Sequence, residues 1–439
     1  MGRCLGLGVH PPCQIAVRVL HMTPELPYEP GGGGGRGREY FLCRRLIERG
    51  HDVLNISPVT PEEAPHAHAL RDVGVENWVL ERPASQLREV AAAVRAEPRV
   101  LAAAAIAPMR ALEMRVFWVG LRALARRAVA EWSPDVVMVG HDMAAAWAQP
   151  LPASIPAVLT LHNLVWHWYL SRARRTKGGH AILLRAEAAR YRAYTLRMLG
   201  RYQAAVAVST IEAAEVRNTS QVPVSVIPTG VDTRVTAPRP EQPGPPRLVF
   251  TGTLSYQPNS EGIAWFADHV WPEVLRAVPN AQLDIVGRGP PSSVLALDDR
   301  PGINVIGPVP VMGPYFDRAH AVIVPILTGA GIRVKIVEAM AAGRAIVSTS
   351  LGWEGLPHVV SGQHLLVADD PAPFAAAAIR LLREPELRQR LAGQGRSLAE
   401  RHYDWRKLGD EQEAVLAGVI AGTPSPARVT SAATAIGEV

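Results

Sequence analysis

The sequence predicts an α/β protein with two doubly wound, Rossmann-like domains that face a central cleft and are followed by C-terminal helices. The chain has 439 residues, which is too many for one ordinary core and enough for two. In both halves, short β-branched segments alternate with amphipathic helical segments, which indicates parallel α/β structure. A Pro-rich stretch over 236–247 separates the halves and is the best domain boundary in the sequence.

The expected strands are short, apolar and bounded by turn residues. In the first half they lie at 15–20, 53–56, 135–139, 157–161, 204–208 and 224–227, and a helix over 37–49 follows the first of them. In the second half they lie at 248–250, 283–286, 304–306, 321–324 and 345–348, with a helix over 332–342 before the last. The leucine spacing over 374–419 indicates further helices.

These patterns divide the chain into four parts. We expect an N-terminal domain over 14–236, a C-terminal domain over 247–403, a helix over 404–420 that can return to the first domain, and a mobile tail over 421–439. The tail is rich in Ala, Thr, Ser, Pro and Gly, so it has too little apolar surface to offset the entropy of ordering.

The composition fits a core-forming protein, because 48% of the residues are hydrophobic and 20% are charged. The net charge of +6 favours an anionic partner, although an Arg-rich composition alone gives the same value. No basic run is interleaved with aromatic residues, so nucleic acid is not an expected partner. Cys4, Cys13 and Cys43 form no pair or histidine cluster of metal-site spacing, so we expect neither a disulfide nor a metal.

No apolar run approaches the roughly 18 residues of a membrane-spanning helix. Residues 1–8 also lack the apolar core and cleavage site of a signal peptide, so we expect a cytoplasmic protein. The aromatic residues Trp166, Trp168 and Tyr169 precede basic residues over 172–177. This pattern predicts either a peripheral surface at the inner face of the membrane, facing a lipid phosphate, or a helix face over a local core.

The segment over 325–338 has the pattern of an anion site. It follows a fully apolar strand and opens an amphipathic helix, and Gly329 and Gly331 allow its backbone to approach a ligand. Arg333 and Lys335 stand at the helix start, where the macrodipole disfavours each cation by about 0.3 to 1 kcal/mol. A bound diphosphate would compensate this cost, since Arg333 can bind it bidentately and Lys335 supplies a compact charge.

Glu338 lies one turn further along this helix. A carboxylate at this position can accept hydrogen bonds from the two ribose hydroxyls of a nucleotide. The alternative is a solvated basic turn in which Lys335 pairs with Glu338 at i,i+3. The two glycines and the expected cleft position favour phosphate binding.

The first half offers further candidate residues. The run Gly31–Gly35 follows a strand and precedes a helix, which predicts contact with ligand phosphates or a second substrate, or else a flexible turn. Arg38, just inside that helix, is a candidate phosphate contact or a surface residue. His162 ends an apolar strand before Asn163, at the carboxyl edge of the sheet, where a neutral imidazole can bind a sugar hydroxyl or share in proton transfer. His141 is a weaker candidate of the same kind.

These residues resemble those of the retaining glycosyltransferases of family 4, which have the GT-B fold. The resemblance extends from about residue 15 to residue 408. In the second half it rests on 250–259 (FTGTLSYQPN), 283–290 (LDIVGRGP), 331–343 (GIRVKIVEAMAAG) and 348–356 (STSLGWEGL), which look like the exopolysaccharide-type branch of sugar transferases. In the first half it rests on 50–53 (GHDV), 161–163 (LHN) and 227–232 (IPTGVD).

The resemblance implies transfer of a sugar from a nucleoside diphosphate sugar to an acceptor hydroxyl, with retained configuration and with no metal or other cofactor. The acceptor would be a glycan, a lipid-linked glycan or a small molecule, bound by the first domain. The implied catalytic residues are His162, Arg333 and Lys335, the last two neutralising the departing diphosphate. The implied donor-binding residues are Gly34, Gly35, Gly252, Arg288, Val309, Gly329, Ala330, Gly331, Ile332 and Glu338.

Two departures from the family pattern keep other functions open. The family commonly has two glutamates flanking seven residues, and Ala330 occupies the position of the first. The basic residues that often follow the first strand of the second domain are absent from 255–260. The alternatives are a nucleotide-sugar epimerase of the same fold and a non-catalytic sugar-nucleotide-binding protein. The sequence does not predict the sugar, the base, the acceptor or the oligomeric state.

Overall fold

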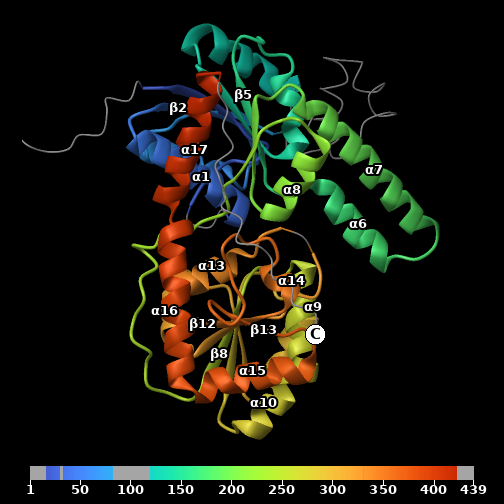
Figure 1. The fold of residues 1–439 in the computed structure, drawn as a ribbon, viewed down its shortest axis with the longest axis vertical. Coiled ribbons are helices and arrows are strands. Elements are labelled where there is room, and N and C mark those ends of the chain that lie inside the picture. Colours follow the sequence, from blue (N-terminus) through green and yellow to red (C-terminus); the bar gives the residue numbers. More distant parts are fainter. Residues whose placement is uncertain (1–15, 30–32, 83–118, 330, 423–439) are drawn as a thin grey trace, which may run out of the picture.

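The computed structural model describes residues 16–29, 33–82, 119–329 and 331–422. They form two α/β units that lie one above the other (Figure 1). Each unit is built on one sheet of parallel strands with helices packed against it. The two doubly wound units predicted from the alternation of strands and helices are therefore confirmed.

The first sheet has the strand order β3-β2-β1-β4-β5-β6-β7. Its strands are β1 (Arg18–Met22), β2 (Asp52–Val59), β3 (Glu76–Glu81), β4 (Val136–Gly140), β5 (Ala157–Leu161), β6 (Ala204–Ala207) and β7 (Val224–Val226). Strand β1 pairs with both β2 and β4, so the winding direction reverses there. Doubly wound sheets bind ligands outside the carboxyl ends of strands at such a switch point.

Both faces of this sheet are buried, as parallel sheets require. Successive residues of β1 point to opposite faces, so Leu20 packs in a core with Trp147, whereas Val19 packs in a second core with Leu46. The helices of this unit are α1 (Gly33–Glu48), α2 (Ala69–Asp72), α6 (Val165–Arg175), α7 (Gly179–Leu199) and α8 (Thr210–Thr219), with short turns at η1 (Ala64–His66), η2 (Ala128–Trp132) and η3 (Asp142–Ala148).

The second sheet has the strand order β10-β9-β8-β11-β12-β13. Its strands are β8 (Arg247–Thr251), β9 (Gln282–Val286), β10 (Ile303–Gly307), β11 (Ala321–Val324), β12 (Ala345–Ser348) and β13 (Leu366–Val367). Its helices are α9 (Gln257–Trp265), η4 (Phe266–Val270), α10 (Trp271–Ala277), α11 (Ser292–Leu295), η5 (Ala296–Asp299), α12 (Gly313–Asp317), α13 (Val334–Ala341), α14 (Ser350–Trp353), α15 (Pro371–Arg383) and α16 (Pro385–His402). Strand β8 lies between β9 and β11, which places a second switch point in this unit.

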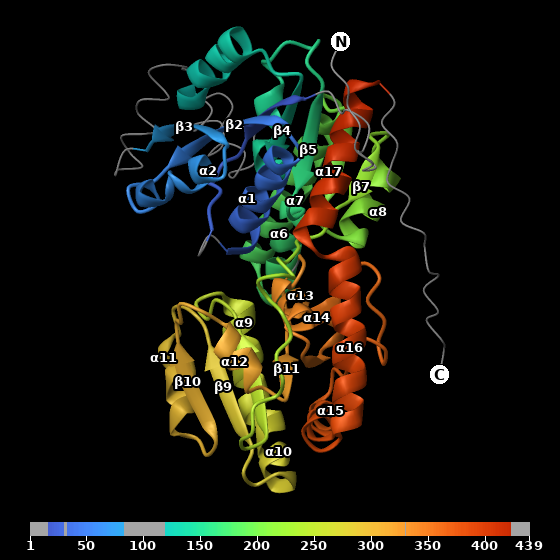
Figure 2. The same cartoon turned by 90° about the vertical axis from the view of Figure 1, so that its left-hand side faces the viewer.

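The last described helix, α17 (Trp405–Ile420), leaves the second unit and lies beside α1 of the first (Figure 2). Glu413 of α17 accepts hydrogen bonds from Arg49 Nε at 2.8 Å and from His51 Nε2 at 3.0 Å. The chain therefore crosses between the units twice, once through 236–247 and once between α16 and α17. Of the predicted tail, residues 423–439 lie outside the described part of the chain.

Several predicted elements have the observed bounds, but two helix starts were wrong. Helix α1 begins at Gly33 instead of residue 37, so Gly34 and Gly35 lie in its first turn. The absence of side chains lets this turn pack closely against its neighbours. Helix α13 begins at Val334 instead of residue 332, because Arg333 has an extended backbone conformation (φ −92°, ψ 91°). Among the described helices, none has the length and apolar character needed to cross a bilayer.

Candidate active site

The first turns of α1 and α13 face each other between the two units. A Cβ atom built on Gly34 of α1 would lie 3.3 Å from Cγ2 of Val334, the first residue of α13. A Cβ atom on Gly331 would lie 2.0 Å from Oδ1 of Asn163, in the loop after β5. The carboxyl edges of both sheets thus meet here, and the unpaired N–H groups of two helices are brought to one place.

The loop before α13 has the backbone that its glycines predict. Gly329 and Gly331 have φ values of 105° and 85°, which side-chain-bearing residues rarely adopt. Ala330, predicted to contact the donor, lies outside the described residues. Arg333 is buried, and its guanidinium donates from Nη1 to the Gly331 carbonyl oxygen at 2.8 Å. In this structure, therefore, Arg333 holds the loop backbone, and burial lowers its pKa.

Lys335 lies in the first turn of α13 and is also buried. Its Nζ donates to Oδ1 of Asn259 at 2.8 Å and lies 4.1 Å from the centroid of the Phe250 ring. Burial and the charge of Arg333 lower the pKa of Lys335 to about 7. The ammonium of Lys335 fits here only because residue 252 is a glycine, since a Cβ atom at Gly252 would lie 2.9 Å from Lys335 Nζ. Arg333 and Lys335 are therefore two neighbouring basic side chains whose charged forms are destabilised by burial.

Glu338 is half-buried one turn further along α13. Burial raises its pKa, Lys335 lowers it to a smaller extent, and Glu29 of the first unit raises it again. The alternative prediction that Lys335 and Glu338 form an ion pair is wrong, because the ammonium bonds to the Asn259 amide instead.

His162, the residue after β5, belongs to a buried chain of hydrogen bonds. Its Nε2 bonds to Oε1 of Glu39, and Oε2 of Glu39 lies 2.9 Å from Nε2 of His21. Burial would raise the pKa of Glu39, but the two histidines outweigh it and lower the pKa well below its ordinary value. Glu39 is therefore an anion that only accepts, so Nε2 of His162 carries the hydrogen.

The other nitrogen of His162 faces the first turn of α1. A Cβ atom on Gly35 would lie 3.3 Å from His162 Nδ1. The ring of His141 stacks on that of His162 with centroids 3.9 Å apart, and His141 has a strained positive φ of 70°. Burial and His162 lower the pKa of His141 well below its ordinary value, so this ring is neutral. Gly35 and His162 are thus brought together as one part of the site.

Two buried carboxyl groups fix the loop that follows His162. Glu212 Oε1 accepts from the Leu164 amide at 3.3 Å, and Asp142 Oδ2 accepts from the Val165 amide at 3.2 Å. Burial raises the pKa of each carboxyl group to about 7. Asn163 therefore meets Gly331 from a loop whose next two residues are anchored by hydrogen bonds.

The remaining predicted residues lie at the edge of this region. Ile332 and Val309 are partly buried against the second unit's core, and the carbonyl oxygen of Arg288 accepts from the Leu254 amide at 2.7 Å. The alternative prediction of Arg38 as a surface residue was wrong, because its side chain is fully buried. Its Nη2 donates to the Ile227 carbonyl oxygen at 2.8 Å. Its role as a phosphate contact stays a prediction.

A groove of about 420 Å³ adjoins the glycine loop. Its walls come from both units, with His167 and Arg174 of α6 on one side and Thr328, Gly329 and Glu354 on the other. The groove therefore lies next to Gly329, where a second substrate could contact a ligand bound at the N-termini of α1 and α13.

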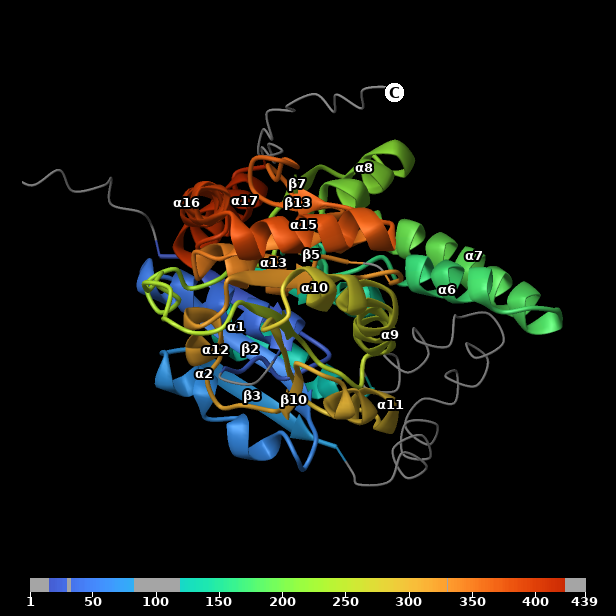
Figure 3. The same ribbon diagram turned by 90° about the horizontal axis from the view of Figure 1, so that it is seen from below.

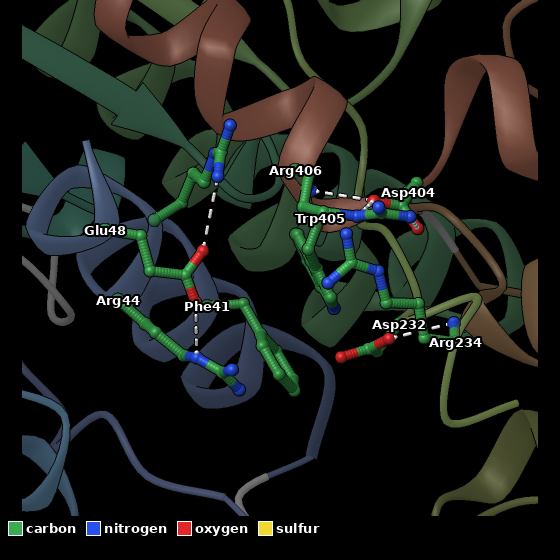
Figure 4. A pocket seen from close by; sticks show the side chains of 9 residues that line it. Phe41, Arg44, Glu48, Asp232, Arg234, Asp404, Trp405 and Arg406 are labelled. Carbon is green, nitrogen blue, oxygen red and sulfur yellow. Dashed lines mark hydrogen bonds and ion pairs between the residues drawn. The ribbon is translucent and has the colours of Figure 1, made fainter.

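A smaller cavity of about 50 Å³ lies away from this site, between α1 and the start of α17 (Figure 4). Phe41 and Trp405 stack there at 5.2 Å, and Arg406 pairs with Asp404. These contacts fasten α17 to the first unit. Within the described ranges, no group of three or more His, Cys, Asp and Glu side chains is placed to hold a metal ion.

Two family models match this chain. "Glycosyltransferase Family 4" matches residues 33–235 and "Glycosyl transferases group 1" matches residues 245–384. The two matches fall on the first and the second α/β unit. The chain belongs to the family 4 type of GT-B glycosyltransferases, as its motifs indicated.

Two curated relatives show what this chain is similar to. The chain is 27% identical over 174 residues to an uncharacterized 44.6 kDa protein in the cps region of Klebsiella pneumoniae, an alignment that covers 37% of this chain and 43% of that protein. The chain therefore spans less than half the length of that relative. It is 25% identical over 412 residues to glycogen synthase of Mycobacterium tuberculosis, which covers 89% of this chain and 92% of that enzyme.

Solved structures share the fold. Sucrose-phosphate synthase from Thermosynechococcus elongatus matches with a TM-score of 0.66 and 16% identity, over 92% of this chain and 100% of that one. HepE of Anabaena in complex with UDP-glucose matches with a TM-score of 0.60 and 12% identity, over 92% and 100%. At these identities the likeness concerns the GT-B architecture.

The sequence patterns missed Glu39 and His21. Neither residue stands in a glycine loop, although His21 lies near the carboxyl end of β1. The available signal was spacing: His21 lies on β1 and Glu39 in the second turn of α1, so both face the switch point at which His162 ends β5.

Proposed function

We propose that this chain is a retaining glycosyltransferase that moves a sugar from a nucleoside diphosphate sugar to an acceptor hydroxyl and needs no metal. The observation that carries the proposal is the meeting of two helix N-termini, those of α1 and α13, beside two buried cations. Helix N-termini bind phosphate through unpaired N–H groups and the positive end of the macrodipole.

The charges of this site fit a diphosphate leaving group. Burial destabilises the charged form of Lys335 and lowers its pKa to about 7. An anionic ligand beside the ammonium would stabilise the charged form again. Arg333 and Lys335 would stabilise the charge that develops on the departing diphosphate, which is the role that a metal ion fills in other transferases. The complex of HepE with UDP-glucose supports a nucleotide-sugar donor for a chain of this fold.

We infer a front-side displacement. The acceptor oxygen bonds to the anomeric carbon on the face from which the bond to the diphosphate breaks, and a diphosphate oxygen takes the acceptor proton. Preorganised donors aimed at the developing charge lower this barrier most. His162 would bind a hydroxyl of the sugar or acceptor through Nδ1, since Glu39 occupies Nε2.

The acceptor would enter through the groove between α6 and the glycine loop, whose mixed polar and apolar lining suits a glycan, a lipid-linked glycan or a small molecule. The relative in the cps region of Klebsiella pneumoniae supports a role in building a surface polysaccharide.

Incubation of the full chain with a panel of labelled nucleotide sugars and added acceptors tests the proposal. Transfer to an acceptor supports it, whereas interconversion of the sugar would identify an epimerase and binding without turnover would identify a binding protein. The same assay in EDTA tests metal independence. The anomeric configuration of the product, measured by NMR, tests retention.

A further inference from the structure

We propose that the tip of the α6–α7 hairpin docks on an anionic lipid surface. Helices α6 and α7 pack against each other and project beyond the rest of the first unit, as Figures 1 and 3 show from two directions. We call residues 172–186, which include the turn between the helices, the hairpin tip. This surface goes beyond the transferase site and does not depend on it.

The hairpin tip exposes two adjacent large aliphatic side chains. Ile182 and Leu183 are each 67% exposed, whereas their neighbours Ala181 and Leu184 are buried. The helix therefore has its packed face toward the protein and presents a second apolar face to the outside. A single exposed aliphatic residue is ordinary, but an adjacent pair on a protruding tip has the form of an insertion point.

The positive charge of the hairpin tip favours an anionic partner. Residues 172–186 carry five Arg and Lys residues (Arg172, Arg174, Arg175, Lys177 and Arg185) and no Asp or Glu. Basic residues beside an apolar face are typical of segments that lie on anionic membranes, where each cation near the surface contributes about 1 kcal/mol. Trp168 lies outside the hairpin tip, nearer the start of α6, and is 40% exposed, with the guanidinium of Arg172 over its ring. A half-exposed tryptophan suits the headgroup region of a membrane, since its ring is apolar and its N–H is polar.

Other partners fit less well. A second copy of the chain would place this cationic tip against an identical one, and like charges at an interface are costly. A nucleic acid would be held through its phosphates and its bases, and neither gives a role to Ile182 and Leu183. Of the two alternatives predicted for Trp166, Trp168 and Tyr169, the helix face over a local core is confirmed for Trp166 and Tyr169, which are buried in the core of the first unit, whereas Trp168 is exposed.

Docking would place the groove of the site close to the lipid. His167, Leu170, Ser171 and Arg174 of α6 line that groove, so one helix joins the hairpin tip to the route proposed for the acceptor. This link to an acceptor rests on the proposed function, whereas docking itself does not.

Co-sedimentation of the full chain with vesicles tests the proposal. We expect binding to vesicles of phosphatidylglycerol and phosphatidylcholine and much weaker binding to phosphatidylcholine alone. The exchange Ile182→Ser with Leu183→Ser should weaken binding about tenfold, since two inserted side chains are lost. The exchange of Arg172, Lys177 and Arg185 to Gln should weaken it about a hundredfold, at about 1 kcal/mol for each cation.

Matched exchanges elsewhere control for general effects. Leu295→Ser with Val311→Ser removes two exposed aliphatic residues from the second unit, and exchange of Arg126, Arg276 and Lys407 to Gln removes three exposed cations. These variants should bind vesicles like the unchanged chain, and thermal unfolding should show that all variants are folded. Equal binding to neutral vesicles, unchanged binding of the tip variants, or self-association that the tip variants abolish would each overturn the proposal. Binding of UDP to the same variants reports on the proposed function separately.

Discussion

Nε2 of His162 donates a hydrogen bond to the carboxylate of Glu39, although the two residues are 123 positions apart in the chain. This contact joins the end of β5 to the first turns of α1 and leaves Nδ1 of the histidine facing Gly35. The orientation of the imidazole in the proposed site is thus set by a carboxylate that itself bonds to His21. Glu39 therefore acts through His162, as a positioning residue.

Glu39→Gln should lower turnover about tenfold to hundredfold, the usual effect of losing a group that orients an active-site residue. The amide can donate to Nε2, so the tautomer of His162 is no longer fixed. Steady-state kinetics should show the loss in kcat, with a changed pH profile and with the donor KM little altered. Glu48→Gln, at the exposed end of the same helix, is the control. An unchanged kcat and pH profile in Glu39→Gln would refute a positioning role.

Arg333→Ala and Lys335→Ala should each lower turnover by about a hundredfold or more, which is the scale of deleting one transition-state charge contact. Arg276→Ala removes an exposed cation of the same unit and should have no effect. The assay is initial-rate transfer from the donor found in the panel experiment. Near-normal rates in both site variants would reject the assignment of these cations to the leaving group.

Binding of a nucleoside diphosphate should weaken as the pH rises above about 7, because the pKa of Lys335 is about 7 in the free protein. The ligand binds the charged lysine, so binding takes up a proton and the dissociation constant rises about tenfold per pH unit above that value. Titration calorimetry in two buffers of different ionisation enthalpy measures both the dissociation constant and the number of protons taken up. Lys335→Gln should bind weakly with little proton uptake, and an uptake equal to that of the unchanged chain would contradict this account.

Gly331→Ala should destabilise the protein and weaken donor binding. The new methyl group would meet Oδ1 of Asn163 at 2.0 Å, and the φ of 85° costs a side-chain-bearing residue about 1 to 2 kcal/mol. Gly393→Ala in α16 is a control of opposite sign, because its Cβ atom meets nothing within 4 Å and alanine stabilises a helix interior by about 0.5 to 1 kcal/mol. Thermal unfolding with and without UDP compares them. Equal melting temperatures for the two variants would count against the contact.

Much of the fold follows from local patterns. Strands 157–161, 321–324 and 345–348 have the predicted bounds because each is a short, fully buried apolar run of a parallel sheet. Strand β3 was not predicted, since Glu76, Asn77 and Glu81 leave only a short apolar run within it. Of its residues only Asn77 is buried, and its side-chain amide bonds to Asn55 and to the Ala67 carbonyl oxygen. The early start of α1 was missed because glycine has a poor helix propensity, which close packing with Val334 and His162 overrides here.

The part of the site whose residues are close together in the sequence was predictable. Gly329, Gly331 and Lys335 share one loop and helix, so their meeting is local. The contacts of Gly34 with Val334 and of Asn163 with Gly331 join separate units, and no periodicity specifies them. Arg38 shows the converse, because its position at a helix start allowed a surface residue while its side chain is fully buried and bonded to the Ile227 carbonyl oxygen.

The central claim is that the facing first turns of α1 and α13 bind the donor's diphosphate. A crystal structure of the full chain with UDP, grown in EDTA, tests it most directly. We expect phosphate oxygens within about 3.2 Å of backbone N–H groups at the start of α13 and of the Lys335 ammonium. A nucleotide bound elsewhere, or a diphosphate held only through an added metal, would contradict the account.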